Sequence, residues 1–214
     1  PRTIQMYHSA THGLIYTDAF FTLGKETIKI GNARDRDFKP DEMKTLIANG
    51  WGFIVIPDVH RPDVGFAMYG TVPDHIVQLF SGTKAFIYFL EALAAILAPM
   101  ILSEIMPQHF YSFVDNEAAK FALLKGYGKQ LRVNRLIGTF WASMLKRCQI
   151  PWFERVSSKA NWADSVSRND WSLVQAKGYV RLRGQKNHIW PILKDIASNP
   201  ELSEIDGADR LQKA

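Results

Sequence analysis

Four acidic side chains occupy places where a carboxylate needs an explanation: Asp18, Glu91, Asp115 and Asp164. Glu91 is the most demanding, because residues 85–102 are otherwise apolar and predict a helix buried on most of its sides. A carboxylate on such a helix must find a cation, a hydrogen-bond donor or a proton. Glu91 is therefore the first residue that we expect to have a function.

The other three acids stand in or beside predicted elements. Asp18 interrupts an aromatic and β-branched stretch typical of a strand, and Asp115 directly follows the short apolar strand 110–114. Asp164 falls just inside a helix for which Asn161 is a good N-cap. Asp164 could be no more than an acid in the first turn of a helix, where the helix dipole stabilises a negative charge. Asp115 could be the N-cap of the helix that follows it. Those two interpretations leave Asp18 and Glu91 unexplained.

The length of the apolar run 85–102 raises the question of a membrane span. Glu91 near its centre would be costly in lipid, and Pro99 interrupts the helix before its end. A core helix of an α/β protein explains the same residues, so no membrane insertion is expected.

The chain between the acids alternates strand and helix patterns. Strands are predicted over residues 13–23, 51–56, 65–72, 110–114 and 152–156, the second and third forming a hairpin. Helices are predicted over residues 83–105, 116–125 and 131–148, and from Asn161 onward. The polar residues 24–50 are interpreted as an insertion with a short helix over 41–48.

This order of elements and acids resembles the ribonuclease H domains of retroelement reverse transcriptases over about residues 14–168. The similarity rests on four segments in the family's order: Ile15-Tyr16-Thr17-Asp18-Ala19, Leu90-Glu91-Ala92-Leu93-Ala94, Phe113-Val114-Asp115-Asn116-Glu117-Ala118-Ala119 and Asn161-Trp162-Ala163-Asp164-Ser165-Val166-Ser167-Arg168. The chain departs from the family at Phe20 and Phe21, which narrow the approach of a hybrid to the first strand. It also departs at residues 157–160, which lack the product-release histidine of cellular relatives.

The resemblance implies an α/β fold, a mixed five-stranded sheet flanked by helices, with the strands of Asp18 and Asp115 adjacent and the helix of Glu91 beside them. It divides the chain into an N-terminal extension (1–12), a ribonuclease H-like domain (13–170, with the insertion 24–50) and a basic C-terminal extension with a polar tail (171–214).

The resemblance also implies that Asp18, Glu91, Asp115 and Asp164 are catalytic residues that bind two Mg²⁺ or Mn²⁺ ions, the cations that hard oxygen ligands prefer. Asp18 and Asp115 would bridge and anchor the ions, Glu91 would lie on the leaving-group side, and Asp164 would lie on the side of the attacking water. Two such ions assist an in-line phosphodiester displacement.

Residues expected to bind nucleic acid come from two regions of the sequence. Asn116 could donate to a 2′-hydroxyl, and a basic group around the next helix start could contact phosphates. A second basic group lies in the C-terminal extension. The full set is Asn116, Lys125, Lys129, Arg132, Arg135, Arg181, Arg183 and Lys186. An ordinary solvated helix face explains the first basic group equally well. For the second group, docking of the extension on its own core or on a protein neighbour is the simpler explanation.

Composition narrows the remaining classes. The 26 Lys and Arg against 21 Asp and Glu give a net charge of +5, which suits a polyanionic partner without requiring one. Cys148 is the single cysteine, so no internal disulfide or thiolate zinc cluster is possible, and no Walker or dinucleotide motif occurs. The chain opens on Pro1, which suggests processing, excision or trimming. We expect an intracellular location, in an organelle or the nucleus.

Two functions follow from the resemblance. The first is a metal-dependent endonuclease that cleaves the RNA strand of RNA–DNA hybrids. The alternative is a domesticated, non-catalytic subunit of a large ribonucleoprotein such as an organellar ribosome, with protein and RNA neighbours. The four acids favour the enzyme, because a structural role gives no reason to keep a buried Glu91.

Overall fold

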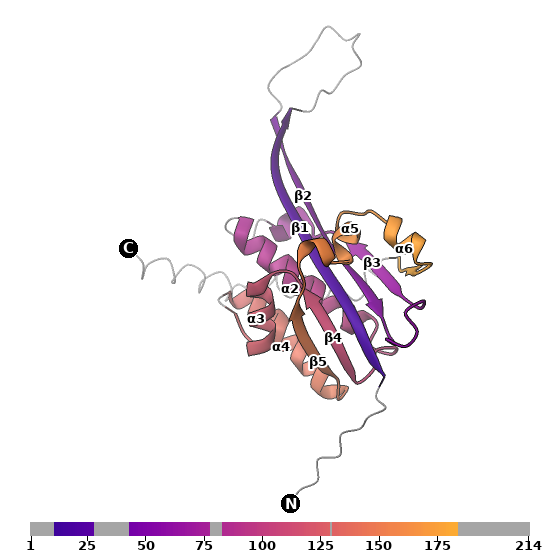
Figure 1. Ribbon diagram of the computed structural model, residues 1–214. Helices are drawn as coiled ribbons and strands as arrows, with labels where there is room; N and C mark the ends of the chain where they lie inside the picture. Colours follow the sequence, from indigo (N-terminus) through magenta and orange to yellow (C-terminus); the bar gives the residue numbers. More distant parts are fainter. Residues whose placement is uncertain (1–10, 28–42, 78–82, 129, 184–214) are drawn as a thin grey trace, which may run out of the picture.

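The computed structural model describes residues 11–27, 43–77, 83–128 and 130–183 (Figure 1). One mixed sheet with the strand order β5-β4-β1-β2-β3-β6 runs through the body. Its strands are β1 (His12–Thr27), β2 (Met43–Ile56), β3 (Phe66–Gly70), β4 (His109–Val114), β5 (Ile150–Arg155) and β6 (Val180–Arg181). The helices are α1 (Asp74–Val77), α2 (Thr83–Ile101), α3 (Glu117–Lys125), α4 (Leu131–Lys146), α5 (Ala163–Ser167) and α6 (Ser172–Ala176). The expected α/β sheet with flanking helices is confirmed.

The sheet has six strands where five were predicted. The additional strand, β6, pairs in parallel with β3 through Phe66↔Val180 and Ala67↔Arg181. A strand of two residues has no periodicity to detect, and the end of the chain that forms it was interpreted as an extension outside the domain.

The predicted helix over 41–48 is wrong, because Met43–Ala48 belong to β2. Strands β1 and β2 pair antiparallel from Leu14↔Ile56 to Thr27↔Met43, whereas β3 pairs with β2 only between Trp51 and Val55. The outer part of β1 and β2 therefore projects from the body as a two-stranded ribbon (Figure 1). Pairing with β1 overrides the local helical pattern. Residues 28–42 of the predicted insertion lie outside the described part of the chain.

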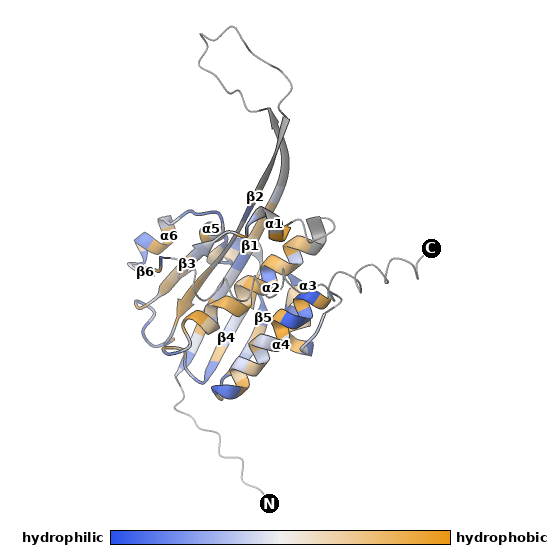
Figure 2. Cartoon of the chain, turned by 180° about the vertical axis from the view of Figure 1, so that it is seen from behind, coloured by the Kyte–Doolittle hydropathy of each residue, from blue (hydrophilic) through white to orange (hydrophobic). Residues whose placement is uncertain are grey.

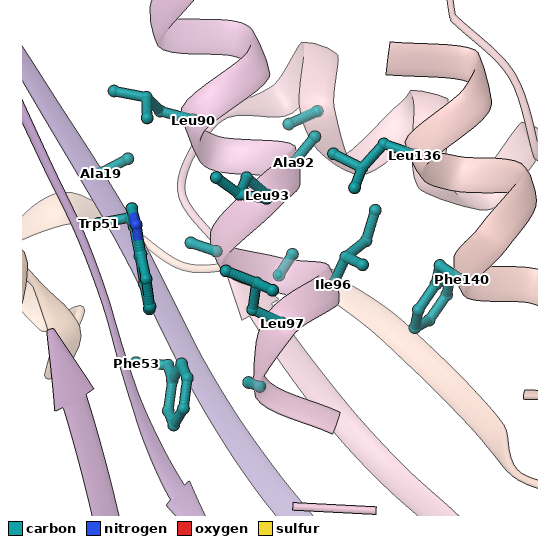
Figure 3. Packing of buried hydrophobic residues seen from close by; sticks show 14 of the residues in the cluster. Ala19, Trp51, Phe53, Leu90, Ala92, Leu93, Ile96, Leu97, Leu136 and Phe140 are labelled. Carbon is teal, nitrogen blue, oxygen red and sulfur yellow. The ribbon is translucent and has the colours of Figure 1, made fainter. Parts of the chain in front are cut away.

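Helix α2 is the centre of the main core. From Phe89 to Pro99 its residues are all buried, and Figure 2 shows α2, α3 and α4 on one side of the sheet. Leu93, Ile96 and Leu97 fill the space between Trp51 and Phe53 of β2 and Leu136 and Phe140 of α4 (Figure 3). Within the described ranges, none of the helices has the length and apolarity needed to cross a membrane. The prediction of a buried core helix is confirmed, although α2 ends at Ile101 rather than near residue 105.

The predicted helix over residues 116–125 is confirmed as α3, which begins at Glu117. The suggestion that Asp115 caps this helix is wrong. Asn116 is its N-cap, and its Oδ1 accepts a hydrogen bond from the backbone N–H of Ala119 at 3.0 Å. Gly126 ends the helix with φ 79°, a left-handed conformation that favours glycine. The cap places the start of α3 directly after Asp115.

Within the described residues, the opposite side of the sheet is covered only in part (Figure 1). Helices α5 and α6 enclose a smaller core there, in which Val166 and Trp171 pack against Ile54 and Ile56 of β2. Strand β5 is the sheet edge beside β4. The N–H of Ile150 donates to Gln108 O, so the backbone N of the next residue, Pro151, faces the open edge.

Candidate metal centre

The pairing of β1 with β4 brings two of the predicted acids together. These strands run parallel, with Thr17 opposite Val114. Asp18 and Asp115 each follow that pair by one residue, so they occupy neighbouring positions where β4 ends. The expectation that their strands are adjacent is confirmed.

Glu91 reaches the same point from α2, which packs against β1. A hydrogen bond from the Ala19 backbone favours its charged form, yet its Oε2 is buried with no hydrogen-bond partner in the structure. Glu91 and Asp18 are only 3% and 2% exposed, and Asp115 is half-buried. One carboxylate oxygen from each of Asp18, Glu91 and Asp115 lies within 4.8 Å of the others.

The three carboxylates cannot all be ionised at low cost without a counter-charge. Burial raises the pKa of Asp18 to about 7, helped by the charges of Asp115 and Asp164, while Ser167 and Arg168 act in the opposite direction. Burial also raises the pKa of Glu91 well above its usual range, with Asp115 and Asp18 adding to the effect. The centre thus takes up either protons or cations near neutral pH.

The donor set fits a hard divalent cation. It consists of carboxylate oxygens alone, and the unpartnered Oε2 of Glu91 lies among them. Such oxygen ligands suit Mg²⁺ or Mn²⁺ better than zinc. Asp18, Glu91 and Asp115 are therefore the residues able to hold the metal, in agreement with the predicted chemistry.

Asp164, the fourth predicted acid, is not among these three. It lies in the first turn of α5, half-exposed, and its Oδ1 pairs with the guanidinium of Arg168 at 3.2 Å. Arg168 in turn stacks over the Phe20 ring, 5.4 Å from its centroid. Asp164 is still close enough to raise the pKa of Asp18. Its predicted role as a metal ligand remains a proposal.

The neighbouring phenylalanines point to opposite sides of the sheet. Phe20 lies under Arg168, on the side of α5, whereas Phe21 packs edge-to-face on Phe86 of α2. Only Phe20 therefore borders the Asp18 side of the sheet.

Two residues that sequence reasoning did not connect with the centre hold Asp18. The Ser167 hydroxyl donates to Asp18 Oδ2 at 2.5 Å, and Asn161 Nδ2 contacts Asp18 Oδ1 at 3.3 Å and Thr17 O at 2.8 Å. Ser158 Oγ similarly donates to Asp115 Oδ2 at 3.0 Å. Asn161 was predicted only as a helix cap, although the N-cap of α5 is Trp162. The sequence contains no local pattern that would have linked Ser167 to a residue 149 positions away.

The predicted nucleic-acid-binding residues are spread over two regions. Lys125 is exposed at the end of α3, with its Nζ 6.0 Å from the Phe121 ring centroid, and Arg135 is exposed on α4. Arg132 is buried on α4 and is therefore poorly placed for a phosphate. Asn116 Oδ1 is engaged in capping α3, which leaves its Nδ2 to donate.

The C-terminal candidates lie at the other edge of the sheet. Arg181 stacks over Trp171, with its guanidinium carbon 3.9 Å from the ring centroid, and Arg183 is exposed. Strand β6, which carries Arg181, is separated from β1 by β3 and β2. Lys129 and Lys186 lie outside the described residues.

No protein-family model and no curated protein matches the chain. Among solved structures, the chain is similar to the "Crystal structure of LC11-RNase H1 in complex with RNA/DNA hybrid". The two are 12% identical, the match covers 77% of this chain and 98% of that one, and the TM-score is 0.44. This similarity does not assign the chain to a family.

Proposed function

We propose that the chain is a ribonuclease H-like, metal-dependent endonuclease that hydrolyses the RNA strand of RNA–DNA hybrids. The observation that carries the proposal is the convergence of Asp18, Glu91 and Asp115, from two adjacent parallel strands and a core helix, to within 4.8 Å. These are the residues and elements on which the resemblance to retroelement ribonuclease H domains rests. The burial of two of the carboxylates supports a cation requirement.

In this proposal the chain's own residues bind and orient. Asp18, Glu91 and Asp115 would hold two divalent cations, while Ser158 and Ser167 fix the orientations of Asp115 and Asp18. Asp164, now paired with Arg168, would be the fourth ligand. When bound, such cations lower the pKa of a coordinated water and stabilise charge on the phosphate and the leaving oxygen.

The substrate contacts follow the same reasoning. Asn116 stands beside Asp115 with a free amide donor for a ribose 2′-hydroxyl, which distinguishes RNA from DNA. Lys125 and Arg135 provide positive charge on α3 and α4 for the phosphate backbone. Arg181 and Arg183 would serve a more distant part of a long substrate.

The direct test is cleavage of an end-labelled RNA–DNA hybrid, with duplex RNA and duplex DNA as comparison substrates, in Mg²⁺, Mn²⁺ or EDTA. We expect cation-dependent cleavage of the RNA strand of the hybrid and a loss of at least 100-fold in Asp115→Asn. Asp63→Asn, an exposed carboxylate in the turn before β3, is the matched control and should retain full activity. Cleavage that persists in EDTA, or that is equal in both variants, would refute the proposal.

A second candidate, the non-catalytic subunit of a ribonucleoprotein, is favoured by Asp164, which pairs with Arg168 at 3.2 Å instead of joining the other three acids. In that case protons, not cations, would neutralise the buried carboxylates of Asp18 and Glu91. Calorimetry separates the candidates: the non-catalytic subunit binds RNA but takes up no Mg²⁺ or Mn²⁺ at pH 8, whereas the enzyme binds these cations and loses them in Glu91→Gln.

A further inference from the structure

The last residue of α5 lies against the middle of β1. Ser167 is fully buried, and its hydroxyl lies between two acceptors, Asp18 Oδ2 at 2.5 Å and the carbonyl oxygen of Asp164 at 2.9 Å. A single hydroxyl thus connects the β1 carboxylate to the helix turn that carries Asp164.

Two glycines of β2 make room for this contact. Gly52 is opposite Asp18 and Gly50 is opposite Phe20 in the β1–β2 pairing, so both lie on the side of the sheet that faces α5. A Cβ added at Gly52 would lie 2.7 Å from the backbone N of Ser167, and one added at Gly50 would collide with Ser167 O. The absence of both side chains lets the backbone of α5 approach the sheet closely enough for the Ser167 hydroxyl to reach Asp18.

The hydrogen bonds from this side engage both oxygens of the carboxylate. Ser167 holds Oδ2, and Asn161, itself 6% exposed, holds Oδ1 while its amide is tied to Thr17 O. A carboxylate has about four lone-pair sites, so one contact on each oxygen leaves the others to face Glu91 and Asp115. The α5 side therefore determines the orientation that Asp18 presents to the centre.

We propose that Ser167, whose backbone packs closely against Gly50 and Gly52, is a positioning residue that sets the metal-binding orientation of Asp18 and couples it to the α5 turn of Asp164. This inference rests on the proposed metal centre and adds to it a hydrogen-bond donor that is not one of the acidic ligands. Partners that orient metal ligands typically contribute 10- to 100-fold to metal affinity.

The test is Mn²⁺ and Mg²⁺ binding by calorimetry, together with the rise in melting temperature on adding Mn²⁺ to the EDTA-treated protein. Ser167→Ala should bind the cations about 10- to 100-fold more weakly and show a smaller rise. Ser165→Ala is the matched control on the same helix, because its buried hydroxyl has no hydrogen-bond partner in the structure, and it should bind within twofold of the wild type. If the role of Ser167 were purely structural, Ser167→Ala would lower the melting temperatures with and without Mn²⁺ equally. The rise on adding Mn²⁺ would then be the same as in the wild type.

The two glycines of β2 that lie under Ser167 provide a second test. Gly52→Ala should displace Ser167 and weaken cation binding to a similar degree, whereas Gly138→Ala on α4, where an added Cβ meets nothing within 4 Å, should not. If Ser167→Ala does not fold, Ser167→Cys keeps one heavy atom on Cβ with a weaker donor and carries the same expectation.

The outcomes separate the two proposals. Wild-type protein that binds no cation overturns the metal centre and this inference with it. Wild-type protein that binds cations while Ser167→Ala and Gly52→Ala bind them as tightly overturns the positioning role alone.

Discussion

Replacing Asp18 with asparagine should stabilise the metal-free protein while removing its response to metal. Asn fits the hydrogen bonds already present. Its Oδ1 can accept from Asn161 Nδ2, and its Nδ2 can donate to Ser167 Oγ, whose own proton then goes to Asp164 O at 2.9 Å. The substitution therefore removes the charge and little else.

The magnitude follows from the pKa of Asp18, which rises from 3.8 to about 7 on folding. A raised carboxyl pKa means that the folded state holds the proton more tightly, so the stability cost is full above pH 7 and vanishes below about 3.8. At about 1.4 kcal/mol per pKa unit, the cost at pH 8 is about 4 kcal/mol, and at pH 5 the difference from asparagine falls to about 2 kcal/mol. The relief of repulsion on Glu91 acts in the same direction.

The assay is urea unfolding in EDTA, followed by tryptophan fluorescence, at pH 5 and pH 8. Asp18→Asn should be more stable than the wild type at both pH values and by more at pH 8. Asp63→Asn, which alters an exposed carboxylate, should differ little from the wild type at either. Added Mn²⁺ should stabilise the wild type and not Asp18→Asn. An Asp18→Asn variant that is less stable than the wild type at pH 8 in EDTA would refute the electrostatic account of the centre.

Three further predictions concern the surroundings of the centre and the core. Arg168→Gln removes a positive charge near Asp18 and breaks the ion pair that engages Asp164. The affinity for Mg²⁺ measured by calorimetry should therefore rise by about two- to fivefold, and unchanged or weaker binding would contradict this prediction. The Asn49 side chain accepts a hydrogen bond from the backbone N–H of Val72 at 2.7 Å and donates one to its carbonyl oxygen at 2.9 Å, so Asn49→Ala leaves both buried groups without partners. The free energy of unfolding in urea should fall by about 2–4 kcal/mol, and a loss below about 1 kcal/mol would contradict the importance of these two bonds. Lys125→Ala should weaken hybrid binding and reduce the slope of log affinity against log salt by about 1 in fluorescence anisotropy, whereas an unchanged slope would exclude a phosphate contact.

The sequence predicted the parts of the centre that depend on local pattern. Asp18 and Glu91 stand out because each places a charge in a strand or helix that is otherwise apolar, and the helical spacing of apolar residues after Asp115 predicts α3. Adjacency of β1 and β4 came from the family resemblance, since strand order is not written in the local pattern of either strand.

What the sequence did not predict depends on contacts between distant segments. Residues 43–48 have helical character locally, yet become a strand because β1 offers a paired edge along its whole length. Nothing in the sequence around Gly50 and Gly52 indicates a contact with α5, although these two glycines determine how closely α5 approaches Asp18. Arg132 belongs to a basic sequence cluster, but its position on α4 buries it.

The edge strand β5 has a consequence for how the molecule behaves at high concentration. An unpaired strand edge presents backbone donors and acceptors that can recruit the same strand of another molecule and begin aggregation. Pro151 removes the backbone donor at an outward-facing position of β5, and the exposed charges of Glu154 and Arg155 follow near the end of the strand. Pro151 and these two charges therefore oppose strand addition at this edge, where the exposed side chains of Ile150 and Trp152 would otherwise favour it.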